Sequence, residues 1–446
     1  MKSSNFQLIV LGIFVTLILV GAGIFATHQA GSGQGVGKVV IWGTVDQTAM
    51  EVALQTLRSS DKTFSNVSYV AHDPATYQSE LVDAMASGKG PDLFFITPET
   101  APSFLNKVQI IPYSAVSQQA FTTAYIDEGS LFLTSQGPLA MPLFIDPMVM
   151  YVNRDNLSAA GVAQAPATWD AVLSVAPQLT SASSDGSGTL AKSAVALGSW
   201  NNIPNAKEIY LTLAMQAGDP ILGRDPSGNT ELVFGETPQS ASGQQAGQNP
   251  AVGALQFFTE FSNPNKVSYS WNRSLPQAQD AFVAGKLALY FGFASEYPTL
   301  LLRNSNIHIG VNPLPQIAGG DQRLTYGRMI GAAIARTSQN PNGALLVAEA
   351  LGSQAGVTAL ATAAKLPPVR RDVTFDTSGN GPMATFVQSA IMSRAWLDPE
   401  PAKTDDIFKT MIESVVTGAA QPDSAVSQAV QALQLFYRNA TGGAVQ

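Results

Sequence analysis

The residue types that most often perform acid–base catalysis form two loose groups in this sequence. Asp92 and Glu99 lie near each other along the chain, and Asp321 lies near Arg323 and Arg328. A glycoside hydrolase uses two carboxyl groups held at a defined distance across a sugar. Spacing along a chain does not establish that distance, so these groups alone do not predict a catalytic pair.

Nucleophilic and metal-dependent catalysis have little support in the sequence. It contains no cysteine and three histidines, His28, His72 and His308. A serine nucleophile requires a histidine base, but His28 precedes the first expected strand, and His72 and His308 lie in or near strands. The histidines are too scattered for a metal site. We therefore expect no catalytic residue, no metal and no cofactor, and a protein that is not an enzyme.

Aromatic and polar side chains near the ends of expected strands favour a binding site for a small polar solute. Aromatic rings suit the C–H faces of a sugar, and amides and carboxylates suit its hydroxyls. Core packing is the alternative role for each aromatic residue; we expect Trp200 and Phe293 to face the ligand, whereas Trp42 and Trp396 fit either role. The candidate ligand-binding residues are Trp42, Glu99, Asp146, Tyr151, Trp200, Asn201, Phe293, Arg328 and Trp396.

Alternating strands and helices position the first of these residues. Residues 39–42 and 67–70 read as short strands, and residues 92–96 read as a third. Apolar residues at helical spacing fill the two intervening segments. This order predicts a mostly parallel sheet with right-handed crossovers. Ligands of such sheets bind at the carboxyl ends of the strands, here residues 42–44 and 97–100.

Two proline-punctuated segments indicate that the chain crosses between lobes. Residues 139–153 are too long for one ordinary strand, and residues 313–315 (Pro-Leu-Pro) suggest a second crossing. A chain of 446 residues also exceeds what one core usually supports. The expected amino-terminal lobe comprises residues 38–140 and 316–350, and the expected carboxyl-terminal lobe comprises residues 141–315 and 351–446.

The charge of the chain argues against a nucleic-acid partner. The formal net charge is -8, the isoelectric point is near 4.9, and no lysine- or arginine-rich cluster is present to bind phosphates.

The amino terminus is typical of an exported protein. Residues 6–25 form an apolar run whose length matches a membrane-spanning helix. Lys2 would hold the amino terminus in the cytoplasm and leave the rest outside. We expect residues 1–30 to be a retained anchor and residues 31–37 a glycine-rich linker. A cleaved signal peptide is the alternative.

Five motifs, in this order along the chain, resemble a known family. They are Gly90-Pro91-Asp92-Leu93, the segment from Pro142 to Asn153, Pro166-Ala167-Thr168-Trp169, Phe282-x-x-Gly285-Lys286-Leu287-Ala288 and Leu366-Pro367-Pro368-Val369-Arg370. The chain is similar to the extracellular solute-binding proteins of ABC importers, in the sugar-binding group that includes maltose-binding proteins. The resemblance covers residues 38–438.

The resemblance implies an α/β, two-lobed periplasmic-binding-protein-like fold of type II, with a cleft between the lobes, preceded here by the expected transmembrane helix. It implies capture of a small-molecule ligand, a mono- or oligosaccharide, and its delivery to ABC permease subunits at the outer face of the cytoplasmic membrane. We expect a monomer. Two alternatives remain open: a binding protein for a non-sugar solute such as an oligopeptide or polyamine, and a sensor that presents its ligand to a receptor.

Overall fold

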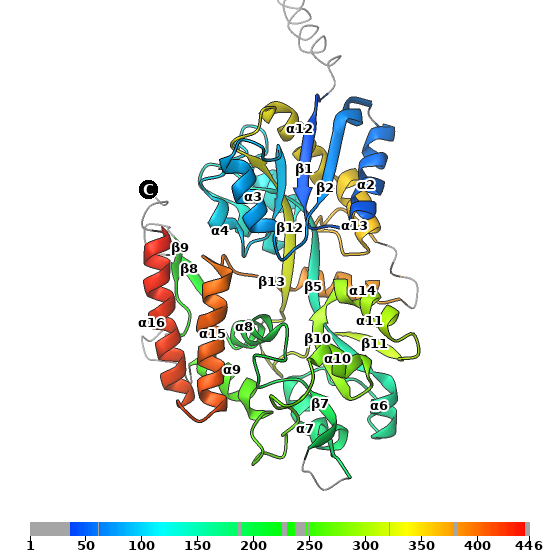
Figure 1. Ribbon diagram of the computed structural model, residues 1–446, viewed down its shortest axis with the longest axis vertical. Helices are drawn as coiled ribbons and strands as arrows, with labels where there is room; N and C mark the ends of the chain where they lie inside the picture. The colour runs from blue at the N-terminus through cyan, green and yellow to red at the C-terminus, as the bar shows by residue number, and fades with distance from the viewer. Residues whose placement is uncertain are drawn as a thin grey trace, which may run out of the picture.

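Two long antiparallel strands run through the middle of the molecule and join its two lobes (Figure 1). They are β5 (Met141–Asn153) and β12 (Thr325–Ala335). The computed structural model describes residues 36–60, 62–184, 189–224, 230–236, 247, 249–320, 322–375, 377 and 381–441. The expected anchor, and the linker up to residue 35, lie outside the described residues.

The amino lobe contains the expected parallel sheet. Strand β1 pairs in parallel with β2 and β3, and β12 then joins β3 to β5 through antiparallel pairs. Apolar residues at helical spacing on the first helix, Met50, Leu54 and Leu57, are buried against this sheet. The elements of this lobe are β1 (Val39–Gly43), α2 (Gln47–Ser60), η2 (Lys62–Asn66), β2 (Val67–Ala71), α3 (Tyr77–Ala86), β3 (Leu93–Ile96), α4 (Ala101–Phe104), β4 (Val108–Gln109), α5 (Gln118–Ala124), η3 (Asp127–Phe132), α12 (Pro341–Gly352) and α13 (Gln354–Ala364).

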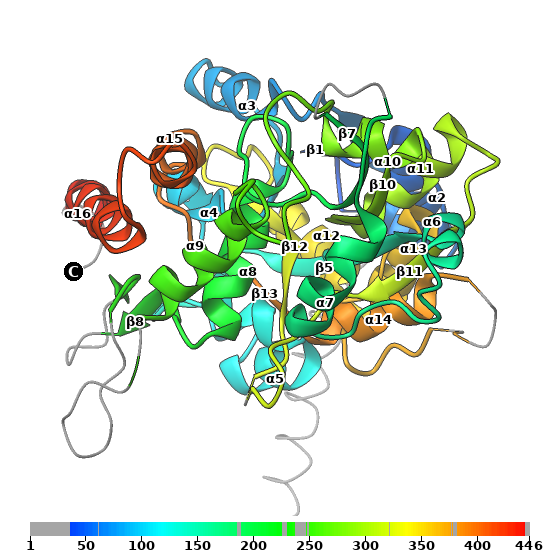
Figure 2. The same cartoon turned by 90° about the horizontal axis from the view of Figure 1, so that it is seen from below.

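The carboxyl lobe is built on the second half of β5. That half pairs with β10 and β11, and β7 extends the sheet beyond β10. Helices α15 and α16 pack together at one side of the lobe, as Figures 1 and 2 show. Its elements are α6 (Arg154–Ala159), α7 (Trp169–Leu179), β6 (Ser181–Ala182), β7 (Leu190–Val195), α8 (Ala206–Gln216), β8 (Leu222–Arg224), β9 (Thr230–Leu232), α9 (Pro250–Glu260), α10 (Ala278–Val283), β10 (Leu287–Phe293), η4 (Ala294–Glu296), α11 (Tyr297–Arg303), β11 (Ile309–Pro313), α14 (Met383–Ile391), β13 (Ser393–Arg394), α15 (Pro401–Val416) and α16 (Pro422–Thr441).

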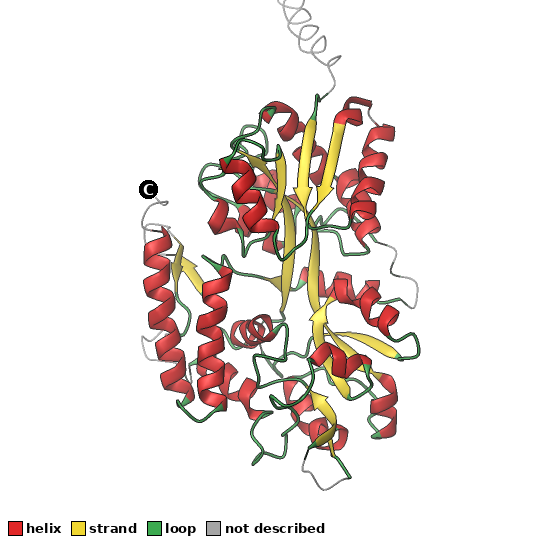
Figure 3. Ribbon diagram, in the orientation of Figure 1, coloured by secondary structure: helices red, strands yellow, loops and turns green. Residues whose placement is uncertain are grey.

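In both lobes helices cover a central sheet, which makes a two-lobed α/β fold (Figure 3). Local capping fixes several helix starts. The Thr168 side chain accepts a hydrogen bond from the backbone N–H of Ala171 at the start of α7. Helix α3 begins at Tyr77, directly after a turn at residues 74–76.

The first crossing, β5, lies within the expected segment 139–153, but the later lobe boundaries differ from the expected ones. The second crossing is β12, because Gln316 still pairs with backbone groups of Ala167 and Trp169 in the carboxyl lobe. Helix α13 packs on α2 of the amino lobe, although residues after 350 were expected in the other lobe. Both differences arise from packing between segments far apart in the sequence.

One finding bears on membrane insertion. In the described part of the chain, no single helix has the length and apolar character to cross a membrane, and the pair α12 and α13 meets that test only as two helices bent by 69°.

Candidate functional site

Arg328 occupies the point where the two strands cross between the lobes. It lies opposite Asp146 in the β12–β5 register. Its guanidinium lies 3.7 Å from the centre of the Phe293 ring, a cation–π contact, and 2.5 Å from a carboxylate oxygen of Glu208 on α8. The Arg328 side chain keeps 40% of its surface accessible, so solvent reaches this point.

Carboxyl groups surround Arg328 from both lobes. Partial burial would by itself lower the pKa of Arg328, but the charges of Glu208, Glu99 and Asp146 raise it. Asp146 accepts a hydrogen bond of 2.9 Å from the backbone N–H of Ser295. Burial raises the pKa of Asp146 to about 6, against the opposing effects of Ser295 and Arg328.

Two further carboxyl groups are buried without full hydrogen bonding. Neither oxygen of Glu99 has a donor at full hydrogen-bonding geometry among the described residues, although hydrogen bonding to the Thr97 and Tyr326 side chains acts to lower its pKa. Glu128 accepts a bond of 3.2 Å from the backbone N–H of Met329 through Oε1, and its Oε2 has no such partner. Burial raises the pKa of both groups, and the charge of Glu99 raises that of Glu128 further.

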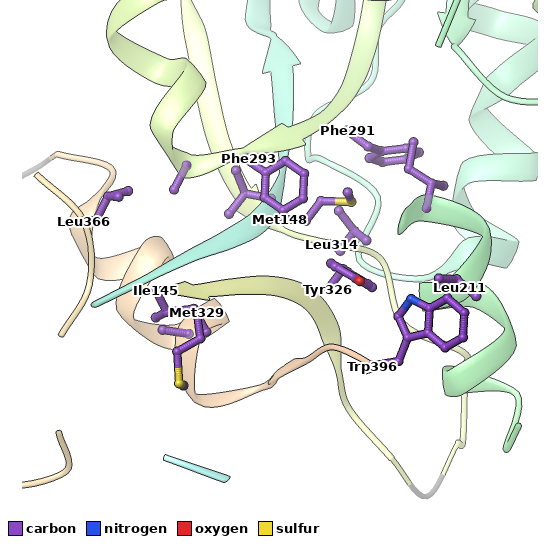
Figure 4. Close-up of a cluster of buried hydrophobic side chains, with 14 of the residues drawn as sticks. Ile145, Met148, Leu211, Phe291, Phe293, Leu314, Tyr326, Met329, Leu366 and Trp396 are labelled. Carbon is purple, nitrogen blue, oxygen red and sulfur yellow. The ribbon is translucent and has the colours of Figure 1, made fainter. Parts of the chain in front are cut away.

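Two buried donors complete the site. The Tyr326 hydroxyl is fully buried and has no hydrogen-bond partner among the described residues, and the same holds for the indole N–H of Trp396. Strand β12 pairs with β13 at Tyr326 and Arg394, and Trp396 comes two residues after Arg394 in the chain. Figure 4 shows the nitrogen edge of Trp396 turned toward the hydroxyl end of Tyr326. Burial raises the pKa of Tyr326 well above its usual value, and the Glu99 charge adds to the shift.

We call this set of residues the junction cluster: Glu99, Glu128, Asp146, Glu208, Phe293, Tyr326, Arg328 and Trp396. It presents hydrogen-bond acceptors and donors that the protein leaves unmatched. Buried polar groups in native proteins are nearly always paired, so unmatched ones call for a partner from outside the chain. In the described ranges, no group of three or more histidine, aspartate or glutamate side chains could hold a metal ion.

The structure brings five of the nine expected site residues to the junction cluster: Glu99, Asp146, Phe293, Arg328 and Trp396. Phe293 differs from expectation in one respect. Its ring is only 1% exposed and carries Arg328 on its face, so it offers no open platform for a sugar.

Tyr151 lies in the core of the carboxyl lobe rather than at an exposed edge. It is fully buried and stacks between Tyr290 and Tyr297. Its hydroxyl donates a hydrogen bond of 2.6 Å to the carbonyl of Phe293 and so fixes the end of β10.

The remaining three expected residues lie at partly open positions outside the junction cluster. Trp42, at the end of β1, packs on the His72 ring at 4.2 Å, and His72 is hydrogen bonded to Glu80. The half-buried Trp200 donates its backbone N–H to Glu413, and Asn201 is exposed.

Sequence reasoning missed Glu128, Glu208 and Tyr326. Tyr326 and Arg328 are two residues apart on one strand and therefore project from the same face, a signal that was available. Glu128 and Glu208 carry no such signal, because only the packing of η3 and α8 against β12 brings them to the site.

A separate surface pocket lies on the carboxyl lobe between α6 and β11, lined in part by Arg154 and Gly310. None of the expected site residues lines it, nor does any of the unpartnered buried polar atoms found in the described segments.

Two α/β lobes joined by crossing strands, with a polar site at the crossing, define the periplasmic-binding-protein-like class. The family model of bacterial extracellular solute-binding proteins matches residues 47–358, and the chain belongs to this family. It is a family of binding proteins, and membership implies an extracytoplasmic location. No curated protein matches the chain significantly.

Solved structures share the fold over nearly the whole chain. A cyclic α-maltosyl-1,6-maltose binding protein from Arthrobacter globiformis has a TM-score of 0.70 and 17% identity, covering 90% of this chain and 99% of its own. A cyclo/maltodextrin-binding protein with maltotetraose has a TM-score of 0.69 and 18% identity, covering 90% and 97%. An ABC transporter solute-binding protein from Thermotoga lettingae, bound to α-D-tagatose, has a TM-score of 0.66 and 18% identity, covering 90% and 99%.

Proposed function

We propose that this protein captures a small hydroxylated solute, a mono- or oligosaccharide, between its lobes and delivers it to the permease subunits of an ABC importer. In this role it binds and releases its ligand without chemical change. The observation that carries the proposal is the set of buried, unmatched donors and acceptors at the junction cluster.

A sugar hydroxyl matches this set because it donates one hydrogen bond and accepts others. The Glu99 carboxylate would accept from hydroxyls, while Tyr326 and Trp396 would donate to them. A solute without such groups would leave the same atoms unpaired, which costs binding free energy and provides discrimination. The structural relatives that bind maltodextrins and tagatose support this choice of ligand class.

Trp42 and Trp200 are the aromatic platforms in the proposed site, since both retain exposed surface. Tyr151 is excluded from direct contact because its hydroxyl is already bonded to the Phe293 carbonyl and its ring is stacked on Tyr290 and Tyr297. The face of the Phe293 ring is occupied by the Arg328 guanidinium, so Arg328 is the group presented to the ligand there. Asn201, exposed beside Trp200, is a proposed peripheral contact.

Binding would close the lobes, because the ligand would contact Glu99 from one lobe and groups around Glu208 from the other. A ligand that touches both lobes binds the closed state better and shifts the population toward it. The β5 and β12 crossings are the proposed hinge, where few backbone angles need to change.

We also propose a lobe division that keeps the first expected boundary near residue 140, moves the second from residue 316 into β12, and moves the third from residue 350 to the end of α13. The apolar run at residues 6–25 is the proposed anchor to the outer face of the cytoplasmic membrane, and the protein would act as a monomer.

Thermal unfolding in the presence of a panel of neutral sugars, including glucose, maltose, maltotriose and tagatose, tests the proposal. A true ligand at 100 times its Kd should add about 2.7 kcal/mol of stability. Tyr326→Phe should weaken binding of that sugar by about 1 kcal/mol without lowering the stability of the free protein, because the hydroxyl it removes has no partner there.

Tyr210→Phe is the matched control. Tyr210 is equally buried, but its hydroxyl donates a bond of 3.0 Å to the carbonyl of Ala251. This variant should lose about 1 kcal/mol of stability and keep its sugar affinity. Sugar binding that is unchanged in Tyr326→Phe would contradict the proposed site.

A further inference from the structure

Four basic residues gather at the end of the amino lobe that points away from the strand crossing. Strands β1 and β3 are parallel and both begin at this end, while β12 runs antiparallel to β3 and finishes there. Strand β4 pairs with the last residues of β12 at the same edge. Figure 1 shows β1 and β2 pointing from this end toward the middle of the molecule. We call this end the basic pole, after its residues Lys38, Lys89, Lys107 and Arg336.

The strand ends place these residues together although they are far apart in the sequence. Lys38 directly precedes β1, and Arg336 directly follows β12. The backbone N–H of Arg336 donates a hydrogen bond of 2.8 Å to the carbonyl of Lys107. Lys89 lies in the loop between α3 and β3. All of these side chains are exposed except that of Lys107, which is half-buried.

None of the four cations forms an ion pair with any carboxylate that the structure describes. The Lys107 ammonium lies 3.2 Å from the Ser103 carbonyl oxygen and 3.3 Å from the Asn106 amide oxygen, and both groups are neutral. The carboxylate at this edge belongs to Asp92. It is directed inward, where it accepts hydrogen bonds from the Val40 N–H at 2.9 Å and the Ser338 hydroxyl at 2.6 Å.

Other charges near the basic pole do not cancel its positive charge. Arg58, near the end of α2, pairs with Glu51, and Asp83 is exposed on α3. Asp61 and Lys62 are adjacent in the sequence, and their formal charges cancel. Positive charge therefore predominates at this end of a chain whose formal net charge is -8.

The chain enters the fold at the basic pole. The Asn340 side-chain amide, at the start of α12, donates hydrogen bonds to the carbonyls of Val36 at 2.8 Å and Lys38 at 3.2 Å. A Cβ on Gly343 would collide with the Val36 carbonyl, so glycine permits this close contact. The apolar run at residues 6–25 is joined to this fixed point by residues 26–35, which span at most about 36 Å even when fully extended.

We propose that the basic pole rests on the anionic lipid headgroups of the membrane that holds the protein. The inference rests on the membrane location that the proposed function includes. Lysine and arginine side chains are attracted to anionic headgroups, and the attraction falls off within a Debye length. An anchor within reach of this pole keeps it close enough for that attraction to act. The contact leaves the strand crossing and the carboxyl lobe on the side away from lipid (Figure 1).

Chemical labelling of lysines on vesicles tests the inference. The full-length chain is inserted into preformed vesicles of phosphatidylcholine alone, or of equal parts phosphatidylcholine and phosphatidylglycerol, and treated with a neutral amine-reactive reagent. Mass spectrometry should show Lys38 and Lys89 reacting several-fold more slowly on the anionic vesicles. The difference should vanish in about 1 M NaCl, where the Debye length is about 3 Å. Lys266 and Lys286, exposed on the carboxyl lobe, should react equally on both.

The double variant Lys89→Gln, Arg336→Gln removes two exposed charges that have no ion-pair partner in the described part of the chain. Each basic residue at an anionic surface contributes about a fivefold factor, so the contact equilibrium should fall about 25-fold. Lys38 should then lose its protection. The matched control Lys266→Gln, Lys286→Gln makes the same change of charge on the carboxyl lobe and should leave that protection intact.

Equal reaction of Lys38 and Lys89 on both kinds of vesicle, or protection of Lys38 that survives in the double variant, would overturn the lipid contact. Sugar-induced thermal shifts would then still support the proposed function. Flotation reports on the anchor separately. A chain that floats with anionic vesicles only, and is released by salt, would support the basic pole and refute the anchor, whereas a chain that floats with neither kind would overturn both.

Discussion

Replacing Lys207 by methionine should destabilise the carboxyl lobe strongly. The Lys207 ammonium lies 3.1 Å from a carboxylate oxygen of Asp398 and also pairs with Asp405. Asp398 is fully buried and accepts a further bond of 2.7 Å from the Thr404 hydroxyl. Methionine keeps most of the side-chain volume of Lys207, so the substitution chiefly removes the charge.

The size of the stability loss in Lys207→Met depends on the Asp398 carboxylate, which stays buried without its ion-pair partner. Burial already raises the pKa of Asp398, and Lys207 is the largest opposing influence. Removing one partner of a buried ion pair costs about 3–5 kcal/mol, since the other charge stays buried without compensation. The loss should appear as a lower urea midpoint at pH 7.5, measured by circular dichroism with the slope of the transition checked for change.

Lys403→Met is the matched control for this prediction. Lys403 forms an ion pair of 3.0 Å with Glu400, and both side chains are well exposed. An exposed pair of this kind contributes less than about 1 kcal/mol. The double variant Lys207→Met, Asp398→Asn should recover part of the loss by removing the orphaned charge. Equal midpoints for Lys207→Met and Lys403→Met would refute the reasoning.

Two other variants test the pKa shift of Asp146 and the proposed role of Trp200 in ligand binding. The pKa of Asp146 is near 6 in the folded protein against 3.8 as its ordinary value, so its penalty is absent below about pH 4 and complete above about pH 6. The stability of Asp146→Asn relative to the unaltered protein, measured by urea denaturation, should therefore rise by up to about 3 kcal/mol between pH 4 and 7.5; a flat difference would contradict the assigned shift. Trp200→Ala should weaken binding of the best sugar by about 1–3 kcal/mol in a calorimetric titration, with a smaller loss of fold stability. Unfolding of that variant would instead identify Trp200 as a core residue.

Local patterns in the sequence were sufficient to predict the order of the first strands and helices and the first crossing between the lobes. The strand–helix alternation at residues 39–96 gave the correct parallel order of β1, β2 and β3, because periodicity and caps are local properties. The proline-punctuated segment at 139–153 was correctly interpreted as a crossing. The second crossing was misplaced because the small residues of β12 are typical of a buried strand, and only its pairing with both β3 and β5 shows where it runs.

The site was less predictable because its geometry depends on packing between distant segments. Phe293 and Tyr151 follow strand patterns that fit either a cleft or a core, and their neighbours Arg328, Tyr290 and Tyr297 decide the outcome. In the same way, the absence of hydrogen-bond partners around Glu99 is a property of the folded chain and has no counterpart in sequence spacing.

A crystal structure with the sugar that gives the largest thermal shift tests the central claim most directly. The account predicts that the sugar lies at the strand crossing, within hydrogen-bonding distance of Glu99 and Tyr326, with contacts to both lobes. A sugar bound elsewhere, for example in the surface pocket beside Arg154 and Gly310, with the junction cluster unchanged, would contradict it.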